Sequence, residues 1–76
     1  MRELPKAHEI WRHFKKNTYE IITIAEHTET GEKFVIYKAL HETMKTYARP
    51  LKDFMSEVDK EKYPRAEQDY RFVKIK

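Results

Sequence analysis

The sequence contains no cysteine and only one glycine, Gly31, among its 76 residues. Without cysteine there is neither a disulfide framework nor a thiolate metal site. A single glycine cannot build the glycine-rich loop that cradles a phosphate. Long apolar runs are also missing, since the longest uncharged stretch, residues 21–25, is far below the roughly 20 residues that cross a bilayer. We therefore expect no disulfide, no phosphate loop, no cofactor and no membrane insertion.

Charge of one sign is not concentrated anywhere in the chain. Sixteen lysines and arginines face 13 aspartates and glutamates, which gives a net charge of +3 that is spread along the sequence. This is a weak indication of a polyanionic partner, and its main effect is solubility. Residues 1–6 contain no apolar segment that a secretion machinery would recognise. We therefore expect a cytoplasmic protein.

The first half of the chain alternates polar and apolar residues with the period of β-strands. This pattern predicts strands at residues 10–14, 19–27 and 34–41, separated by turns at 15–18 and 28–33. In the first turn Asn17 tolerates a positive φ, and in the second turn Gly31 takes it at no steric cost. Apolar residues of both parities occur in residues 21–25, which is typical of a strand buried on both sides or strongly coiled.

The second half adds a connector at 42–46, an extended segment at 47–50 and a change of period. Apolar residues three and four apart from Leu51 to Val58 predict one or two helical turns near 51–60, either capped by Asp53 or started by Pro50. A closing strand follows at 70–75. We therefore predict an all-β protein: a small SH3-like barrel of about five antiparallel strands, with residues 9–76 as a single domain and residues 1–8 as a flexible lead-in.

Several blocks in the right order resemble a known family. They are Trp11–Lys15, Tyr19–Ile21, Ala25–Thr30, Ile36–Leu40 and Arg49–Phe54. Together they are similar to the bacterial family called domain of unknown function 1653, which implies a small β domain and supplies no reaction. The chain departs from the family pattern at four positions. Lys16 stands where glycine is common, Glu42 and Lys45 stand in a connector that often has glycines, and Asp53 replaces a frequent methionine.

Histidine chemistry has weak support in the sequence. His13 could act as a base with Glu20 or Glu29, but neither pairing comes with an evident nucleophile. The four histidines have no spacing that binds a metal locally. His27 and Glu29 are two residues apart, which favours a local ion pair that steadies the hairpin. We therefore expect no catalytic residue, no metal and no enzymatic activity.

Basic and aromatic residues alternate along the chain, and two interpretations stay open. The rings form either the core or a stacking surface for a ligand, and Arg49 either braces a loop by stacking on a ring or clamps an anion. We expect a binding module for a peptide or protein partner; the alternative is a nucleic-acid-associated factor. We expect a monomer or a weak homodimer. The candidate binding residues are Trp11, Arg12, His13, Tyr37, Tyr47 and Arg49.

Overall fold

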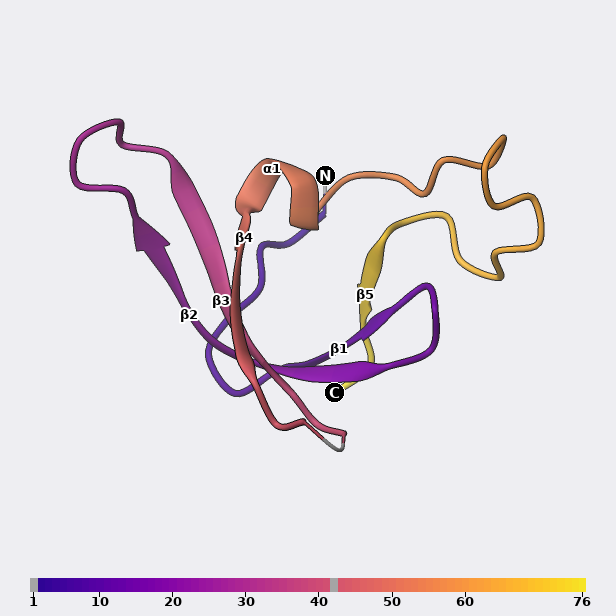
Figure 1. Cartoon of the computed structure of the whole chain (residues 1–76), viewed down its shortest axis with the longest axis horizontal. Coiled ribbons are helices and arrows are strands. Elements are labelled where there is room, and N and C mark those ends of the chain that lie inside the picture. Colours follow the sequence, from indigo (N-terminus) through magenta and orange to yellow (C-terminus); the bar gives the residue numbers. More distant parts are fainter. Residues whose placement is uncertain (1, 42) are drawn as a thin grey trace.

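A five-stranded antiparallel sheet in the order β4-β3-β2-β1-β5 forms most of the molecule (Figure 1). The computed structural model describes residues 2–41 and 43–76, so Met1 and the connector residue Glu42 lie outside the described residues. The elements are β1 (Ile10–His13), β2 (Thr18–Glu26), β3 (Lys33–Ala39), β4 (Thr46–Pro50), the helix α1 (Leu51–Phe54) and β5 (Phe72–Lys74). The predicted all-β class and the five strands are confirmed.

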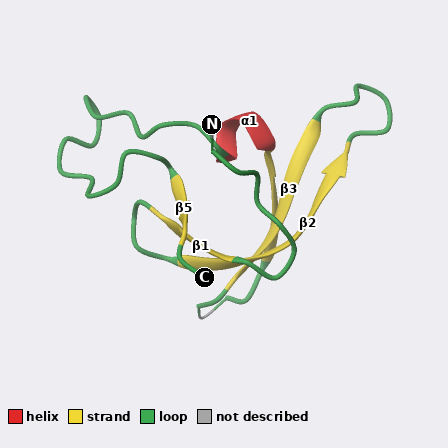
Figure 2. Ribbon diagram, turned by 180° about the vertical axis from the view of Figure 1, so that it is seen from behind, coloured by secondary structure: helices red, strands yellow, loops and turns green. Residues whose placement is uncertain are grey.

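The sheet is curled into an open trough, so the expected barrel is not closed (Figure 2). In the described part of the chain, β4 and β5 are the two edges and each pairs on one side. The gap has two physical causes. β5 has only three residues, and β4 ends at Pro50, which lacks the N–H that a further ladder would need. The chain then turns into α1, which occupies the mouth of the trough.

A β-bulge in β2 explains the mixed parity of its apolar residues. Ile21 pairs with Tyr37 and Thr23 with Ile36, so Ile22 is an extra residue without a partner. The extra residue reverses the alternation, and Ile24 therefore returns to the same face as Ile21 and packs against the core. Ile22 itself is 41% exposed. β2 is consequently bent at a bulge, and its faces are not the simple odd and even sets that alternation predicts.

The core lies between α1 and one face of the sheet, which we call the inner face. Phe54 of α1 is fully buried, and its ring stacks on that of Phe72 with centroids 4.0 Å apart. The same ring lies 5.5 Å from Trp11 and 5.4 Å from Tyr37. A short helix thus unites three strands through one side chain, and fully burying a phenylalanine contributes about 1.5–3 kcal/mol.

The helix α1 is shorter than the spacing predicted. It ends after one turn because the Ser56 hydroxyl donates to the Asp53 carbonyl (2.6 Å), and the chain then pairs with the C-terminal segment through the Glu57–Tyr70 bridge. Pro50, with a φ of −52°, occupies the residue before the helix. Of the two proposed starts, the one with Pro50 is therefore observed. No helix in the described part of the chain is long and apolar enough to span a membrane.

The β1–β2 and β2–β3 turns each contain a residue with a positive φ, but only one of these residues is a glycine. Gly31 takes the left-handed conformation with a φ of +76°, as predicted. In the first turn the residue with a positive φ is Lys16 (86°), so the expectation for Asn17 was wrong. The Lys16 N–H closes this turn by donating to His13 O (2.7 Å). Lys16 thus takes, without a glycine, the conformation for which glycine is best suited.

The N-terminal segment lies against the sheet. Arg2 donates to the carbonyl oxygens of Met55 (3.1 Å) and Phe72 (2.6 Å), and its guanidinium lies 3.8 Å from the Tyr70 ring centroid. Pro5 is buried, and the His8 N–H donates to Ile21 O (2.8 Å). These contacts give the segment a defined place, while the flexibility predicted for residues 1–8 stays a prediction about its motion.

Candidate anion-binding site on the inner face

Arg49 is the central residue of the candidate site. In the β3–β4 ladder Tyr47 pairs with Tyr37 and Arg49 with Val35, so β4 directs Tyr47 and Arg49 to the inner face. The Arg49 Nε donates to the Tyr37 hydroxyl (3.0 Å) and its Nη1 donates to the Asp53 carboxylate (2.9 Å). Its guanidinium carbon also lies 5.5 Å from the Phe72 ring centroid. These are the contacts that the bracing interpretation of Arg49 requires, and the clamp interpretation stays open beside it.

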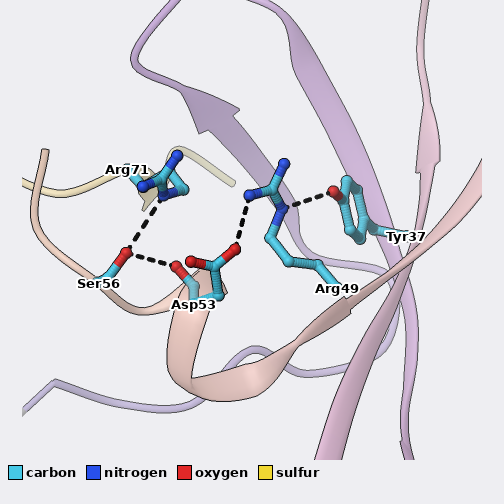
Figure 3. A network of polar contacts seen from close by, with 5 residues as sticks. All are labelled: Tyr37, Arg49, Asp53, Ser56 and Arg71. Atoms are coloured by element: carbon cyan, nitrogen blue, oxygen red, sulfur yellow. Dashed lines mark hydrogen bonds and ion pairs between the residues drawn. The ribbon is translucent and has the colours of Figure 1, made fainter.

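Arg71 joins the same network from the C-terminal segment (Figure 3). Its Nε donates to Ser56 Oγ (3.2 Å), and its backbone N–H donates to Ser56 O (2.9 Å). Since Ser56 also donates to the Asp53 carbonyl, Asp53 and Ser56 connect the two arginines. We call the following residues the arginine cluster: His13, Tyr37, Arg49, Asp53, Ser56 and Arg71.

The pKa of His13 reflects the positive charges of the cluster. Burial, reinforced by the positive charges of Arg49, Arg71 and Lys15, lowers the pKa of His13 from 6.5 to about 4. Its ring lies between those of Phe14 (4.5 Å) and Phe72 (4.8 Å). Its Nδ1 accepts the Lys15 N–H (3.1 Å), which leaves the hydrogen on Nε2. The imidazole is therefore neutral at neutral pH, in a region where positive charge is in excess.

Positive charge in the cluster is only partly neutralised. Burial acts to lower the pKa of Arg49, but the hydrogen bonds and charges of Tyr37 and Asp53 outweigh it and raise the pKa above its ordinary value. Asp53 forms an ion pair with Arg49, whereas no carboxylate among residues 2–41 and 43–76 lies within ion-pair distance of Arg71. The arrangement suits an added anion, because guanidinium groups bind carboxylate or phosphate bidentately.

The structure brings four of the six predicted site residues together and separates two. His13, Tyr37, Tyr47 and Arg49 share the inner face, where Tyr47 is 40% exposed. The Tyr37 ring is buried in the core, 5.8 Å from the ring of Tyr47, so its hydroxyl is the part that serves the cluster.

The other two residues have structural contacts. The Trp11 ring is 3% exposed and its Nε1 donates to Glu9 (2.9 Å), so this ring belongs to the core. Arg12 pairs with Val73 in the ladder one position from Trp11, which directs it to the outer face. There it lies against the loop before β5, and the Gln68 amide donates to Arg12 O (3.1 Å).

Three members of the cluster were not among the predicted site residues: Asp53, Ser56 and Arg71. Asp53 was considered only as a helix cap, and Ser56 had no pattern that singled it out. Arg71 had one usable signal, because it lies between Tyr70 and Phe72 much as Arg12 and His13 lie between Trp11 and Phe14. A cation between two aromatic residues is the signal that would have made Arg71 a further candidate.

The histidines and glutamates considered for catalysis lie apart. Glu20 faces His8, with 3.4 Å between the His8 Nδ1 and the carboxylate. His27 accepts the backbone N–H groups of Glu29 (3.1 Å) and Thr30 (3.3 Å), so its contact with Glu29 is through the backbone and not the expected ion pair. Across the residues that the structure describes, no three His, Cys, Asp or Glu side chains gather closely enough to hold a metal ion.

Comparison with known proteins adds the family. No curated protein and no solved structure matches the chain. The model of the family described as "Protein of unknown function (DUF1653)" matches residues 9–74, which cover all five strands and the whole arginine cluster. The chain therefore belongs to the DUF1653 family of proteins of unknown function.

Proposed function

We propose that this protein is a non-enzymatic binding module whose ligand is an acidic segment of a peptide or protein, held on the inner face. The observation that carries the proposal is the pair of arginines in one network, of which Asp53 neutralises only Arg49. A carboxylate of the ligand would meet the guanidinium of Arg71, and its backbone would lie along the exposed ring of Tyr47.

His13 supports a binding role over a catalytic one. A general base works best with a pKa near the operating pH, whereas the pKa of His13 is lowered to about 4. Its Nδ1 is also engaged by the Lys15 N–H. The imidazole thus acts as a wall of the site, between two phenylalanine rings, and a cytoplasmic location stays part of the proposal.

The test uses capped hexa-aspartate as the probe and hexa-asparagine as its uncharged control, followed by amide NMR shifts. We expect hexa-aspartate to shift the amides of His13, Arg49 and Arg71, and hexa-asparagine to leave them unmoved. Arg71→Gln should weaken the binding about tenfold, because it removes a charged hydrogen bond. The control Lys45→Gln removes the same charge from the β3–β4 loop and should retain binding. Equal binding by Arg71→Gln and the unchanged protein, with equal melting temperatures, contradicts the proposal.

A nucleic-acid-associated role is the second candidate. The observation that favours it is a pocket next to the cluster where Lys15, Lys62 and Arg65 surround the rings of Phe14 and Tyr63. Aromatic rings with cations around them are the usual platform for single-stranded nucleic acid. A thymidine octamer distinguishes the two roles: if it binds more tightly than hexa-aspartate and loses affinity steeply between about 50 and 200 mM salt, the nucleic-acid role replaces the peptide role.

A further inference from the structure

A pocket of about 380 Å³ lies beside the arginine cluster, at the β1–β2 turn. Its apolar walls come from Phe14, Tyr63, Pro64 and Ala66. The rings of Phe14 and Tyr63 meet with centroids 4.8 Å apart and planes tilted by 58°. Phe14 is held from both sides, since its backbone N–H donates to Arg71 O (2.9 Å) and its ring lies on His13. One wall of the pocket is therefore hydrogen-bonded to the segment that carries Arg71.

The remaining lining residues, Lys15, Lys62 and Arg65, are all cations. The ammonium groups of Lys15 and Lys62 lie 5.4 Å and 5.6 Å from the centroid of the Tyr63 ring. None of the three is in an ion pair with a described carboxylate. An apolar floor with a positive rim complements a large apolar group that has negative charges next to it.

The side chains of the pocket favour an apolar side chain over a nucleobase. Phe14, Pro64 and Ala66 carry no polar side-chain atom, and the phenol of Tyr63 is the one neutral polar group among the lining side chains. A base would bring a polar edge that needs several hydrogen-bond partners, and leaving such groups unpaired costs free energy. A phenylalanine or leucine side chain brings no such requirement.

The pocket and the arginine cluster lie close together in space and are joined through buried rings of the core. Contacts lead from Tyr63 to Phe14, then to His13 (4.5 Å) and to Phe72 (4.8 Å), and Arg49 lies 5.5 Å from Phe72. The whole path is at most about 20 Å, which five or six extended residues span. One short peptide can therefore reach both ends.

We infer that the pocket of Phe14 and Tyr63 binds a large apolar, above all aromatic, side chain of the same acidic peptide that the arginine cluster holds. This inference rests on the proposed function and specifies its ligand: an aromatic residue flanked by acidic residues, with a further acidic residue about five positions away. The cation rim meets the flanking carboxylates, and the apolar floor buries the ring.

The experiment uses the capped octapeptide Asp-Phe-Asp-Ser-Gly-Ser-Asp-Asp and the same peptide in reverse order, so that both chain directions are tested. A version with alanine for phenylalanine is the control. We expect the phenylalanine peptide in one direction to shift the amides of Lys15, Tyr63 and Arg71, and the alanine version to bind about tenfold more weakly. The exposed double change Lys62→Glu and Arg65→Glu should weaken binding severalfold, whereas Lys45→Glu should not.

The outcomes separate this inference from the proposed function. If the phenylalanine and alanine peptides shift the Arg71 amide equally and leave the Tyr63 amide unmoved, binding in the pocket of Phe14 and Tyr63 is refuted. The acidic-peptide function then stands. If neither peptide binds at millimolar concentration, both are refuted. If a thymidine octamer shifts Tyr63 and Lys62 at lower concentration than the phenylalanine peptide, the pocket belongs to a nucleic acid and the inference fails.

Discussion

The lowered pKa of His13 predicts how the stability of the protein changes with pH. The folded-state pKa of His13 is about 4, below the ordinary value of 6.5 that applies to the unfolded chain. Between these values the unfolded state binds more protons than the folded state, so lowering the pH favours unfolding. The contribution of His13 to stability is therefore present in full above pH 6.5 and is lost as the pH falls toward 4.

The magnitude follows from the same two values. For a fully buried ring the difference between 6.5 and about 4 corresponds to ~3 kcal/mol. His13 is only half-buried, and solvent screens the charges of Arg49, Arg71 and Lys15, so we expect about 1–2 kcal/mol. Protonation also places a hydrogen on Nδ1, which would end the hydrogen bond from the Lys15 N–H.

The assay compares two matched substitutions. His13 and His27 both accept, through Nδ1, the backbone N–H of the residue two positions on, and asparagine can offer an oxygen in the same place. Urea unfolding is followed by the fluorescence of Trp11, the only tryptophan, at pH values from 7 to 4. His13→Asn should flatten the pH dependence of the unfolding free energy in this range, and His27→Asn should preserve it.

Equal losses of unfolding free energy between pH 6.5 and 4 in His13→Asn and in the unchanged protein would contradict this role of His13. The absolute stability of His13→Asn at pH 7 is expected to be lower, because the imidazole ring packs between Phe14 and Phe72. The quantity to compare is therefore the change of the unfolding free energy with pH, and not its value at pH 7. Direct titration of the His13 ring signals by NMR is an independent check, with an inflection expected near pH 4.

Three further changes test the fold itself by their effect on the free energy of unfolding. Lys16→Gly should stabilise the folded protein by about 0.5 kcal/mol, because relief of the positive φ slightly outweighs the entropy that glycine adds to the unfolded chain. The control Lys15→Gly should destabilise the protein. A lower stability for Lys16→Gly than for Lys15→Gly would contradict backbone strain at Lys16. Gly31→Ala should cost about 1 kcal/mol through its φ of +76° alone, because the space for a Cβ is open, and Gly31→Asn should cost less. Phe54→Ala should lower the free energy of unfolding by about 3–5 kcal/mol, and the exposed control Ile75→Ala by less than about 0.5 kcal/mol. An unchanged melting temperature for Phe54→Ala would show that its ring does not hold the core together.

The order and type of the elements follow from local patterns in the sequence. Alternation predicted the first three strands to within one or two residues, because a period of two reflects which side chains face each side of the sheet. The spacing from Leu51 to Val58 placed the helical turn correctly, although it overestimated its length. Gly31 was located in its turn for a local reason, namely that its φ depends on its own missing Cβ.

Features that depend on contacts between distant residues emerge only in the folded chain. The bulge at Ile22 arises from pairing with β3, and the burial of Trp11 and Tyr37 follows from where Phe54 docks. Arg49 and Arg71 are linked through Asp53 and Ser56 although 22 positions separate them, because β5 pairs with β1 and brings the residue before it to Ser56. Periodicity records which face a side chain takes, whereas the neighbours on that face are set by strand order and helix docking, which no local pattern contains.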